Sequence, residues 1–181
     1  MKNFLLMFIG VMLCIPAFTQ TPANSKTAVR WYTIQEAEKL SQNSPRPLFI
    51  DTYTDWCGWC KKMDQETFIH PVIAEILNNR FYPVKFNAER TDSVTFLGQT
   101  FVNDGKYGKA HQLAIALLRG QLSYPTVIIM TKKDNKYYIN PFPGFKDPKD
   151  MEMLLTYFAN NAFEIQSWED FQKGFQGRIQ Q

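Results

Sequence analysis

The sequence has little excess of either charge and contains no internal repeat, no low-complexity tract and no linker rich in glycine or serine. Its 20 basic and 17 acidic residues give a formal net charge of +3, which gives no reason to expect nucleic acid or an anionic membrane as a partner. The lack of linkers and repeats favours a single domain for a chain of 181 residues. With 45% hydrophobic residues, that domain has enough apolar side chains for a real core.

Long hydrophobic runs are also absent, with one exception at the N-terminus. Residues 4–15 are nearly all apolar and follow the positively charged Lys2, but about 20 such residues are needed to span a bilayer. Small residues before Gln20 suit signal peptidase, which predicts a signal peptide over residues 1–19 and a mature chain in the periplasm or secreted. The alternative is a lipoprotein anchored through Cys14, although the residue before it is bulkier than that processing site usually accepts.

Cysteine is scarce, since the chain has three and removal of the signal peptide leaves only Cys57 and Cys60. This Cys-x-x-Cys pair lies between an apolar run, 48–53, and a helix-like segment, 61–66. A thiol at a helix start is favoured as the thiolate by the unpaired backbone N–H groups and the helix dipole. Because the thiolate attacks in disulfide exchange, we expect Cys57, at the exposed helix start, to be a nucleophile. Cys60, one turn inside the helix and facing the sheet, can then close an intramolecular disulfide and release the bound partner.

Two other interpretations of the cysteine pair stay open. One is half of a zinc site, but zinc needs about four ligands and only His70 and His111 are available to complete it. Neither has ligand spacing, and we expect His70 at a helix boundary and His111 as an exposed or capping residue of its helix. The other is a purely structural disulfide, which would add little stability because so short a ring hardly constrains the unfolded chain.

Hydrophobic periodicity and turn residues predict alternating helices and strands. Thr33 and Glu36 have the spacing of a capping box that opens the first helix. The expected helices cover 33–41, 57–68, a piece around 72–77, 110–118, 147–160 and a short segment from 167, and the expected strands cover 48–54, 81–87, 125–131 and 136–139. Pro141 and Pro143 are expected to end the sheet. This order predicts an α/β domain with a mixed central sheet flanked by helices.

Several positions together resemble the thioredoxin superfamily, and more narrowly the secreted thioredoxin-like proteins related to the C-terminal domain of the bacterial transmembrane disulfide reductase. Asp51 lies six residues before Cys57, where the family has its buried acid, and Trp56 stands where the family has an aromatic residue. The segment 123–126, Ser-Tyr-Pro-Thr, matches the cis-proline loop, and Gly144 precedes the final helix as a glycine does in the family. The resemblance implies a thioredoxin-like fold.

The resemblance covers residues 47–160, which we expect to be the core of a single domain over 20–181. An insertion at about 90–106, with a small hairpin inside it, and a helical C-terminal extension at about 161–181 depart from the family pattern. The sequence assigns no role to either segment.

The resemblance also implies roles for two charged residues. Asp51 corresponds to the acid that accepts the proton of Cys60 through water, although an ordinary residue at the end of the sheet is the alternative. Lys85 matches a lysine that pairs with this acid in thioredoxin, although its side chain could equally reach solvent from an edge strand.

The remaining expected site residues surround the cysteines. The motif match implies that Pro125 is cis rather than trans, which leaves the Tyr124 backbone groups free to pair with a substrate strand. Trp56 and Trp59 flank the thiols and are expected to form an apolar lip that contacts the substrate polypeptide, with burial in the core as the alternative. Trp59 departs from the family, because thioredoxin has proline there and the isomerases have histidine.

These features predict an exported thiol–disulfide oxidoreductase that acts on protein or peptide thiols and disulfides. No charged residue lies between Cys57 and Cys60, and we expect Lys61 and Lys62 to point to solvent, so a reductant fed by a membrane-bound donor is favoured over an oxidant. We expect a monomer with no metal, no nucleic-acid partner and no cofactor other than the cysteine pair. The alternative from another class is a non-catalytic thioredoxin-fold module that binds peptides.

Overall fold

A computed structural model describes residues 28–134 and 136–180. The expected signal peptide and Cys14 lie outside the described residues. The elements in chain order are α1 (Ile34–Asn43), β1 (Leu48–Tyr53), α2 (Gly58–Glu66), α3 (Pro71–Arg80), β2 (Tyr82–Asn87), β3 (Val94–Phe96), β4 (Gln99–Phe101), α4 (Gln112–Leu117), β5 (Thr126–Lys133), β6 (Lys136–Pro143), α5 (Pro148–Ala159), the 3-10 helix η1 (Ala162–Glu164) and α6 (Trp168–Gly174). No helix within the described part is long and apolar enough to cross a membrane.

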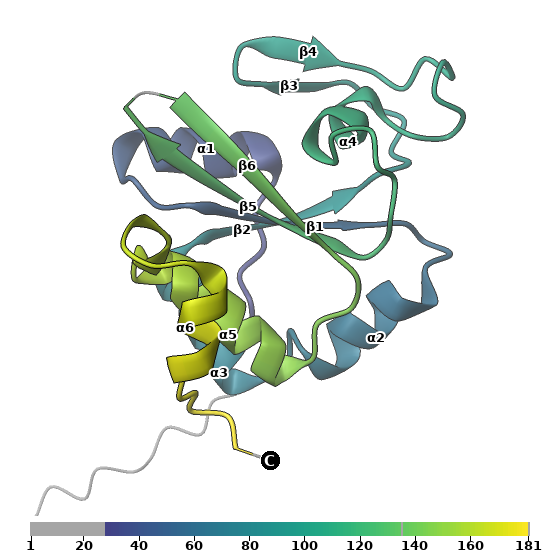
Figure 1. Ribbon diagram of the computed structural model, residues 1–181. Coiled ribbons are helices and arrows are strands. Elements are labelled where there is room, and N and C mark those ends of the chain that lie inside the picture. Colours follow the sequence, from purple (N-terminus) through teal and green to yellow (C-terminus); the bar gives the residue numbers. More distant parts are fainter. Residues whose placement is uncertain (1–27, 135, 181) are drawn as a thin grey trace, which may run out of the picture.

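The central sheet has the strand order β2-β1-β5-β6. Strands β1 and β2 are parallel, whereas β5 runs antiparallel to both β1 and β6. Helices α2, α3 and α5 pack on one face, and α1 and α4 pack on the other (Figure 1). The predicted α/β domain with a mixed sheet flanked by helices is therefore confirmed.

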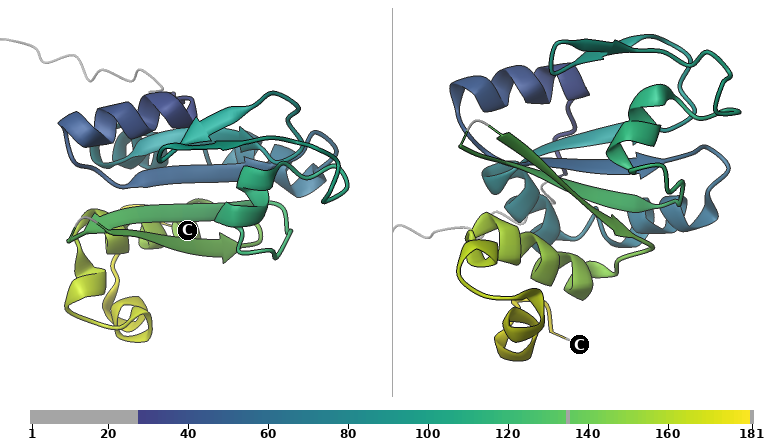
Figure 2. Two further views of the ribbon diagram at one scale, coloured as in Figure 1. Left: turned by 90° about the horizontal axis from the view of Figure 1, so that it is seen from above. Right: turned by 45° about the horizontal axis from the view of Figure 1, so that its top comes forward.

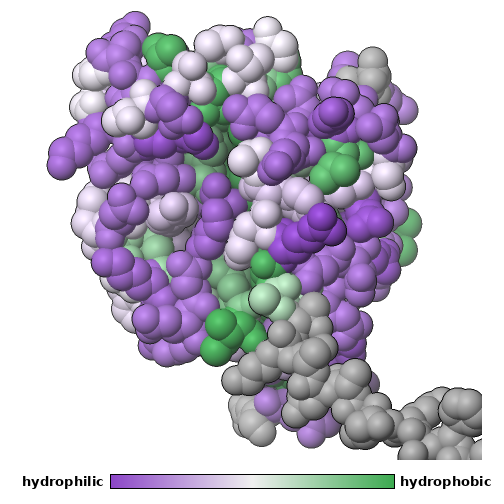
Figure 3. Space-filling model, turned by 180° about the vertical axis from the view of Figure 1, so that it is seen from behind, coloured by the Kyte–Doolittle hydropathy of each residue, from purple (hydrophilic) through white to green (hydrophobic). Residues whose placement is uncertain are grey.

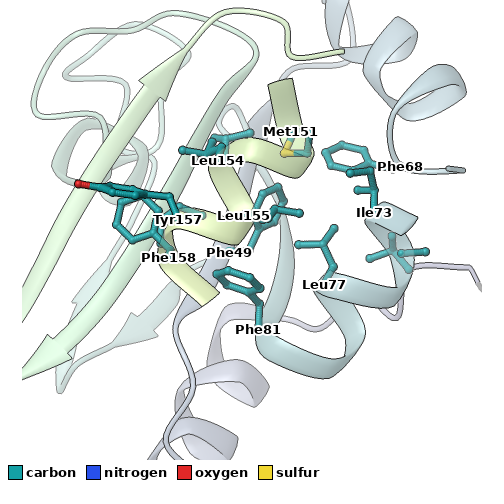
Figure 4. Packing of buried hydrophobic residues seen from close by; sticks show 14 of the residues in the cluster. Phe49, Phe68, Ile73, Leu77, Phe81, Met151, Leu154, Leu155, Tyr157 and Phe158 are labelled. Atoms are coloured by element: carbon teal, nitrogen blue, oxygen red, sulfur yellow. The ribbon is translucent and has the colours of Figure 1, made fainter. Parts of the chain in front are cut away.

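Strand β1 is buried on both faces of the sheet, and the alternation of its side chains between the two faces decides on which face Asp51 lies. Phe49 packs in the cluster under α3 and α5 (Figure 4), whereas Leu48 and Ile50 pack in the cluster under α1 and α4. Residues two apart in a strand share a face. Asp51 therefore lies on the same face as Phe49, the face that α2 covers.

Side-chain caps fix the starts of the helices as the sequence predicts. Thr33 and Glu36 form the expected capping box of α1. His70 and His111 are the N-caps of α3 and α4, and each accepts a backbone N–H at Nδ1. The expectation that these histidines cap or bound helices is confirmed, and His111 is fully buried in that position.

Strand β6 continues farther than expected. It pairs with β5 as far as Pro143, with Pro141 opposite Ile128, so the prediction that these prolines end the sheet was wrong. Because β6 is at the edge of the sheet, a proline there can direct its missing N–H away from the neighbouring strand without losing a ladder hydrogen bond.

The insertion forms the expected hairpin, β3 paired with β4, and it lies on the α1 side of the sheet (Figures 1 and 2). Val94 and Phe96 are buried in the cluster under α1 and α4. The turn is tight because Leu97 and Gly98 both have positive φ, 51° and 76°. The hairpin is therefore part of the packed core on this face.

The C-terminal extension packs against α5 and is held there by a buried carboxylate. Glu152 on α5 is 3% exposed and accepts the backbone N–H groups of Arg178 at 2.7 Å and Ile179 at 2.9 Å. Tyr157 packs edge-on against Trp168 of α6.

Hydrophilic residues cover most of the back face of the molecule, and apolar residues show there only in small areas (Figure 3).

Candidate redox site

Cys57 and Cys60 are joined by a disulfide at the N-terminus of α2. Cys57 is the N-cap of this helix, and its Sγ accepts the backbone N–H of Cys60 at 3.1 Å. The same donor and the helix dipole are available to a Cys57 thiolate after reduction. The position therefore stabilises negative charge on Cys57, as the sequence predicts.

The two cysteines differ less in exposure than expected. We predicted an exposed Cys57 and a buried Cys60, but the oxidised residues are 4% and 2% exposed. In the disulfide each sulfur covers the other, and the bulky neighbours Trp56 and Trp59 take most of the solvent-facing surface, with exposures of 65% and 59%. The distinction between the two thiols therefore rests on their positions in α2 and not on exposure in the oxidised state.

Asp51 is fully buried on the face of the sheet that α2 covers, and burial raises the pKa of its carboxyl to about 6 despite the opposing charge of Lys85. Its Oδ2 accepts a hydrogen bond from Lys85 Nζ at 2.7 Å. Its Oδ1 is buried and has no hydrogen-bond partner among the described residues. Such a carboxyl can exchange a proton near neutral pH, which an ordinary surface aspartate cannot do.

Lys85 points inward from the edge strand β2 and joins two carboxylates. Its Nζ contacts Asp51 and also Asp64 of α2. Burial lowers the pKa of Lys85, but Asp51 and then Asp64 outweigh that effect and raise it. The ring centroids of Trp31, Tyr53 and Phe68 lie 5.0 to 5.2 Å from the ammonium. The pairing of Lys85 with Asp51 is confirmed, and Lys85 stays charged.

Trp56 is exposed, as predicted, and is held on one side of the disulfide. Its indole N–H donates to Glu89 Oε2 at 3.1 Å, and its ring meets the ring of Tyr124 edge-on, with centroids 6.0 Å apart. The Tyr124–Pro125 peptide bond is cis, as expected. Trp56 therefore lies in a fixed position between the cis-proline loop and the end of β2.

Trp59 is exposed on the other side and packs against Phe145, with centroids 5.5 Å apart. Lys62 lies over both rings, with its Nζ 5.2 Å from the Trp59 centroid and 5.4 Å from that of Phe145. Lys61 and Lys62 are both exposed, as expected. The position of the Lys62 ammonium over the two rings was not expected, and the cation–π attraction favours it.

Three residues of this site were missed in the sequence: Asp64, Glu89 and Phe145. Asp64 comes four residues after Cys60, so the two side chains share a face of α2, and this spacing could have predicted that Asp64 belongs to the site. Glu89 and Phe145 come from loops after β2 and β6, and no spacing in the sequence links them to the cysteines. No group of three or more metal-binding side chains occurs between residues 28 and 180 as far as the structure describes them.

The fold and this site are those of a thioredoxin-fold protein with a cysteine pair in disulfide contact, which supports a function of the thiol–disulfide oxidoreductase type in general. The chain belongs to the Thioredox_DsbH family, described as a protein of unknown function (DUF255), which matches residues 19–170. The resemblance to the thioredoxin superfamily is thereby confirmed.

Individual relatives are distant. An uncharacterized protein of Caenorhabditis elegans is 25% identical over 125 residues, which are 59% of this chain and 17% of that protein. The chain thus spans less than a fifth of the length of that relative. A thioredoxin from Thermus thermophilus superposes with a TM-score of 0.54 at 18% identity, covering 71% of this chain and 85% of the other. A structure named DsbH oxidoreductase gives 0.53 at 14% identity, covering 82% and 94%. These two similarities show the fold.

The position of the cysteines in α2 predicts a large difference in thiol reactivity. In the reduced protein near neutral pH, Cys57 at the N-cap will react with iodoacetamide at least about tenfold faster than Cys60, because one unit of thiol pKa changes the thiolate fraction about tenfold. Mass mapping after brief labelling measures both rates, and labelling in denaturant provides the control in which the two thiols become alike. Equal labelling of the folded protein would contradict the assignment of Cys57 as nucleophile.

Proposed function

We propose that this chain is an exported thiol–disulfide oxidoreductase that reduces disulfides in proteins or peptides. The observation that carries the proposal is the Cys57–Cys60 pair at the N-terminus of α2, the helix that covers the face of the sheet in which the acid Asp51 is buried. The fold similarity to a protein named an oxidoreductase supports it. The predicted signal peptide supports export to the periplasm or secretion.

The proposed reaction transfers two electrons in two exchange steps. The Cys57 thiolate attacks a substrate disulfide, forms a mixed disulfide and releases the first substrate thiolate. Cys60 then loses its proton to Asp51 and attacks the Cys57 sulfur, which forms the intramolecular disulfide and releases the second substrate thiolate. The substrate disulfide is reduced to two thiols, and the cysteine pair is oxidised.

A dithiol donor must then return two electrons to the pair, and we propose that a membrane-bound reductase supplies them. Trp56, Trp59 and the Tyr124–Pro125 loop are the proposed substrate contacts, because they surround the disulfide and the two indoles are exposed. The proposed unit is a monomer, and its redox group is the cysteine pair itself.

The proposed direction rests on the charges around the thiolate. Strong oxidases of this superfamily stabilise the reduced form with a very low cysteine pKa of about 3.5, whereas thioredoxin has about 7. Gly58 and Trp59 between the cysteines carry no charge, and the ammonium of Lys62 is shared with two rings and with Glu66, 3.8 Å away. The helix start is then the main source of thiolate stabilisation, which favours a reducing pair.

Equilibration against glutathione buffers measures this direction. We expect a potential nearer to the thioredoxin value of about −270 mV than to the oxidase value of about −120 mV. A Lys62→Ala variant should stay within about 30 mV of the wild type, since an exposed charge contributes little. A potential more oxidising than about −160 mV would mean that the chain is an oxidant.

A further inference from the structure

We propose that the surface around the disulfide selects substrate cysteines that have a basic residue on one side and an acidic residue on the other. This inference rests on the proposed function and names the substrate class of the same site. Two pairs of aromatic residues lie beside the cysteines, and charged side chains of opposite sign accompany them. The pair with carboxylates, Trp56 and Tyr124, is called the acidic side, and the pair with ammonium groups, Trp59 and Phe145, is called the basic side.

The acidic side is built around a carboxylate that contacts the exposed indole. Glu89 Oε2 accepts the N–H of Trp56 at 3.1 Å, which holds the negative charge at the edge of the ring. Asp55, which directly precedes Trp56, is exposed and accepts a hydrogen bond from the Asn87 side chain at 3.2 Å. Arg90 is engaged elsewhere, since its guanidinium forms two hydrogen bonds with Asp92. The acidic side therefore presents two carboxylates without a cation among these contacts.

The basic side presents two ammonium groups, one of them over aromatic rings. Lys62 lies over both Trp59 and Phe145, and Lys146 donates to the carbonyl oxygens of Pro143 at 2.9 Å and Gly144 at 3.4 Å. Lys62 pairs with Glu66, 3.8 Å away and exposed, and the charge of Asp150 on α5 acts on Lys146. An exposed pair of this kind is weak, so Lys62 can exchange it for an acidic group of a substrate.

The sheet topology places the two sides across the site from each other. Glu89 follows β2 at one edge of the sheet, and Phe145 follows β6 at the opposite edge. The register pairs Thr52 with Thr126 and Thr126 with Pro143, so these loops lie at the same end of the sheet, around the start of α2. A polypeptide whose cysteine reaches Cys57 would therefore meet carboxylates on one side and ammonium groups on the other.

Short model disulfides test this preference directly. One pentapeptide carries Lys before and Glu after its central cysteine, a second carries the two charges in reverse order, and a third carries glutamine at both positions. Each is linked to mercaptoethanol, a neutral partner, and tryptophan fluorescence follows oxidation of the reduced protein. We expect the wild type to reduce one charged isomer between about twofold and tenfold faster than the other, the effect of one or two exposed ion pairs.

A charge-swapped variant, Glu89→Lys with Lys62→Glu, should invert the preference between the two charged isomers, with each rate divided by the rate of the same variant for the neutral peptide. The matched control exchanges Lys133 and Glu164, an ion pair of 3.5 Å involving the far end of β5, and should keep the wild-type preference. Equal wild-type rates for the two isomers, or an unchanged preference in the swapped variant, would overturn the inference. Failure to reduce any of the three peptides would instead count against the proposed function.

Discussion

A Cys60→Ala variant, reduced and mixed with a disulfide-containing protein, will accumulate a covalent complex through Cys57. The first exchange step needs only the Cys57 thiolate, which the N-terminus of α2 still stabilises. The second step needs the thiol of Cys60, so the mixed disulfide has no internal route to resolution. We expect most of the variant to enter the complex, whereas wild type shows only a trace. Gel electrophoresis without reductant, followed by mass mapping of the linked peptide, measures this.

The matched control is Cys57→Ala, which keeps the thiol inside α2 and removes the one at the N-cap. It should form at least about tenfold less complex, because Cys60 lies inside the helix and lacks the stabilising position. Equal complex formation by the two variants would show that either thiol can attack and would contradict the assigned order of the steps.

At pH 8 the free energy of unfolding of an Asp51→Asn variant will exceed that of wild type by up to about 3 kcal/mol. This is the free energy that corresponds to a carboxyl pKa about two units above its usual value. Burial raises the pKa of Asp51 from 3.8 to about 6. The native state therefore binds the proton more tightly than the unfolded state does. This contribution to stability is present below about pH 4 and is lost as the pH rises through about 6. Asparagine has no such charge to bury.

Urea unfolding of the oxidised proteins at pH 4, 6 and 8 measures this difference, which should be small at pH 4 and largest at pH 8. Asp64→Asn is the matched control, because it removes the other, more exposed partner of Lys85. Its effect should be at most about 1 kcal/mol at each of the three pH values. Greater wild-type stability than Asp51→Asn at pH 8 would mean that the Lys85 pair outweighs the burial cost. We also expect Asp51→Asn to slow the resolution of mixed disulfides.

The local features of this fold could be predicted from the sequence because short-range physics fixes them. The capping box of Thr33 and Glu36, the caps at His70 and His111, and the cysteine pair at a helix start all depend on neighbours within four residues. The ion pair of Lys85 with Asp51 joins two strands, and there the family resemblance supplied the partner that spacing could not.

The features that escaped prediction depend on contacts between distant segments. Glu89 reaches Trp56 from the loop after β2, and Phe145 reaches Trp59 from the loop after β6. Lys62 folds back because Phe145 provides a second ring, which its own helix does not reveal. Strand β6 tolerates Pro141 because it is at the sheet edge, a fact of topology. Hydrophobic periodicity contains none of this information.

The central claim is that Cys57 and Cys60 form a catalytic redox pair that reduces protein disulfides. Reduction of insulin with dithiothreitol as electron donor tests it most directly, because precipitation of the freed insulin chain reports disulfide cleavage. We expect wild type to shorten the onset of turbidity in proportion to its concentration, and Cys57→Ala to match the sample without protein. A wild type that leaves the onset unchanged would contradict the claim and would favour a thioredoxin-fold module that binds peptides without catalysis.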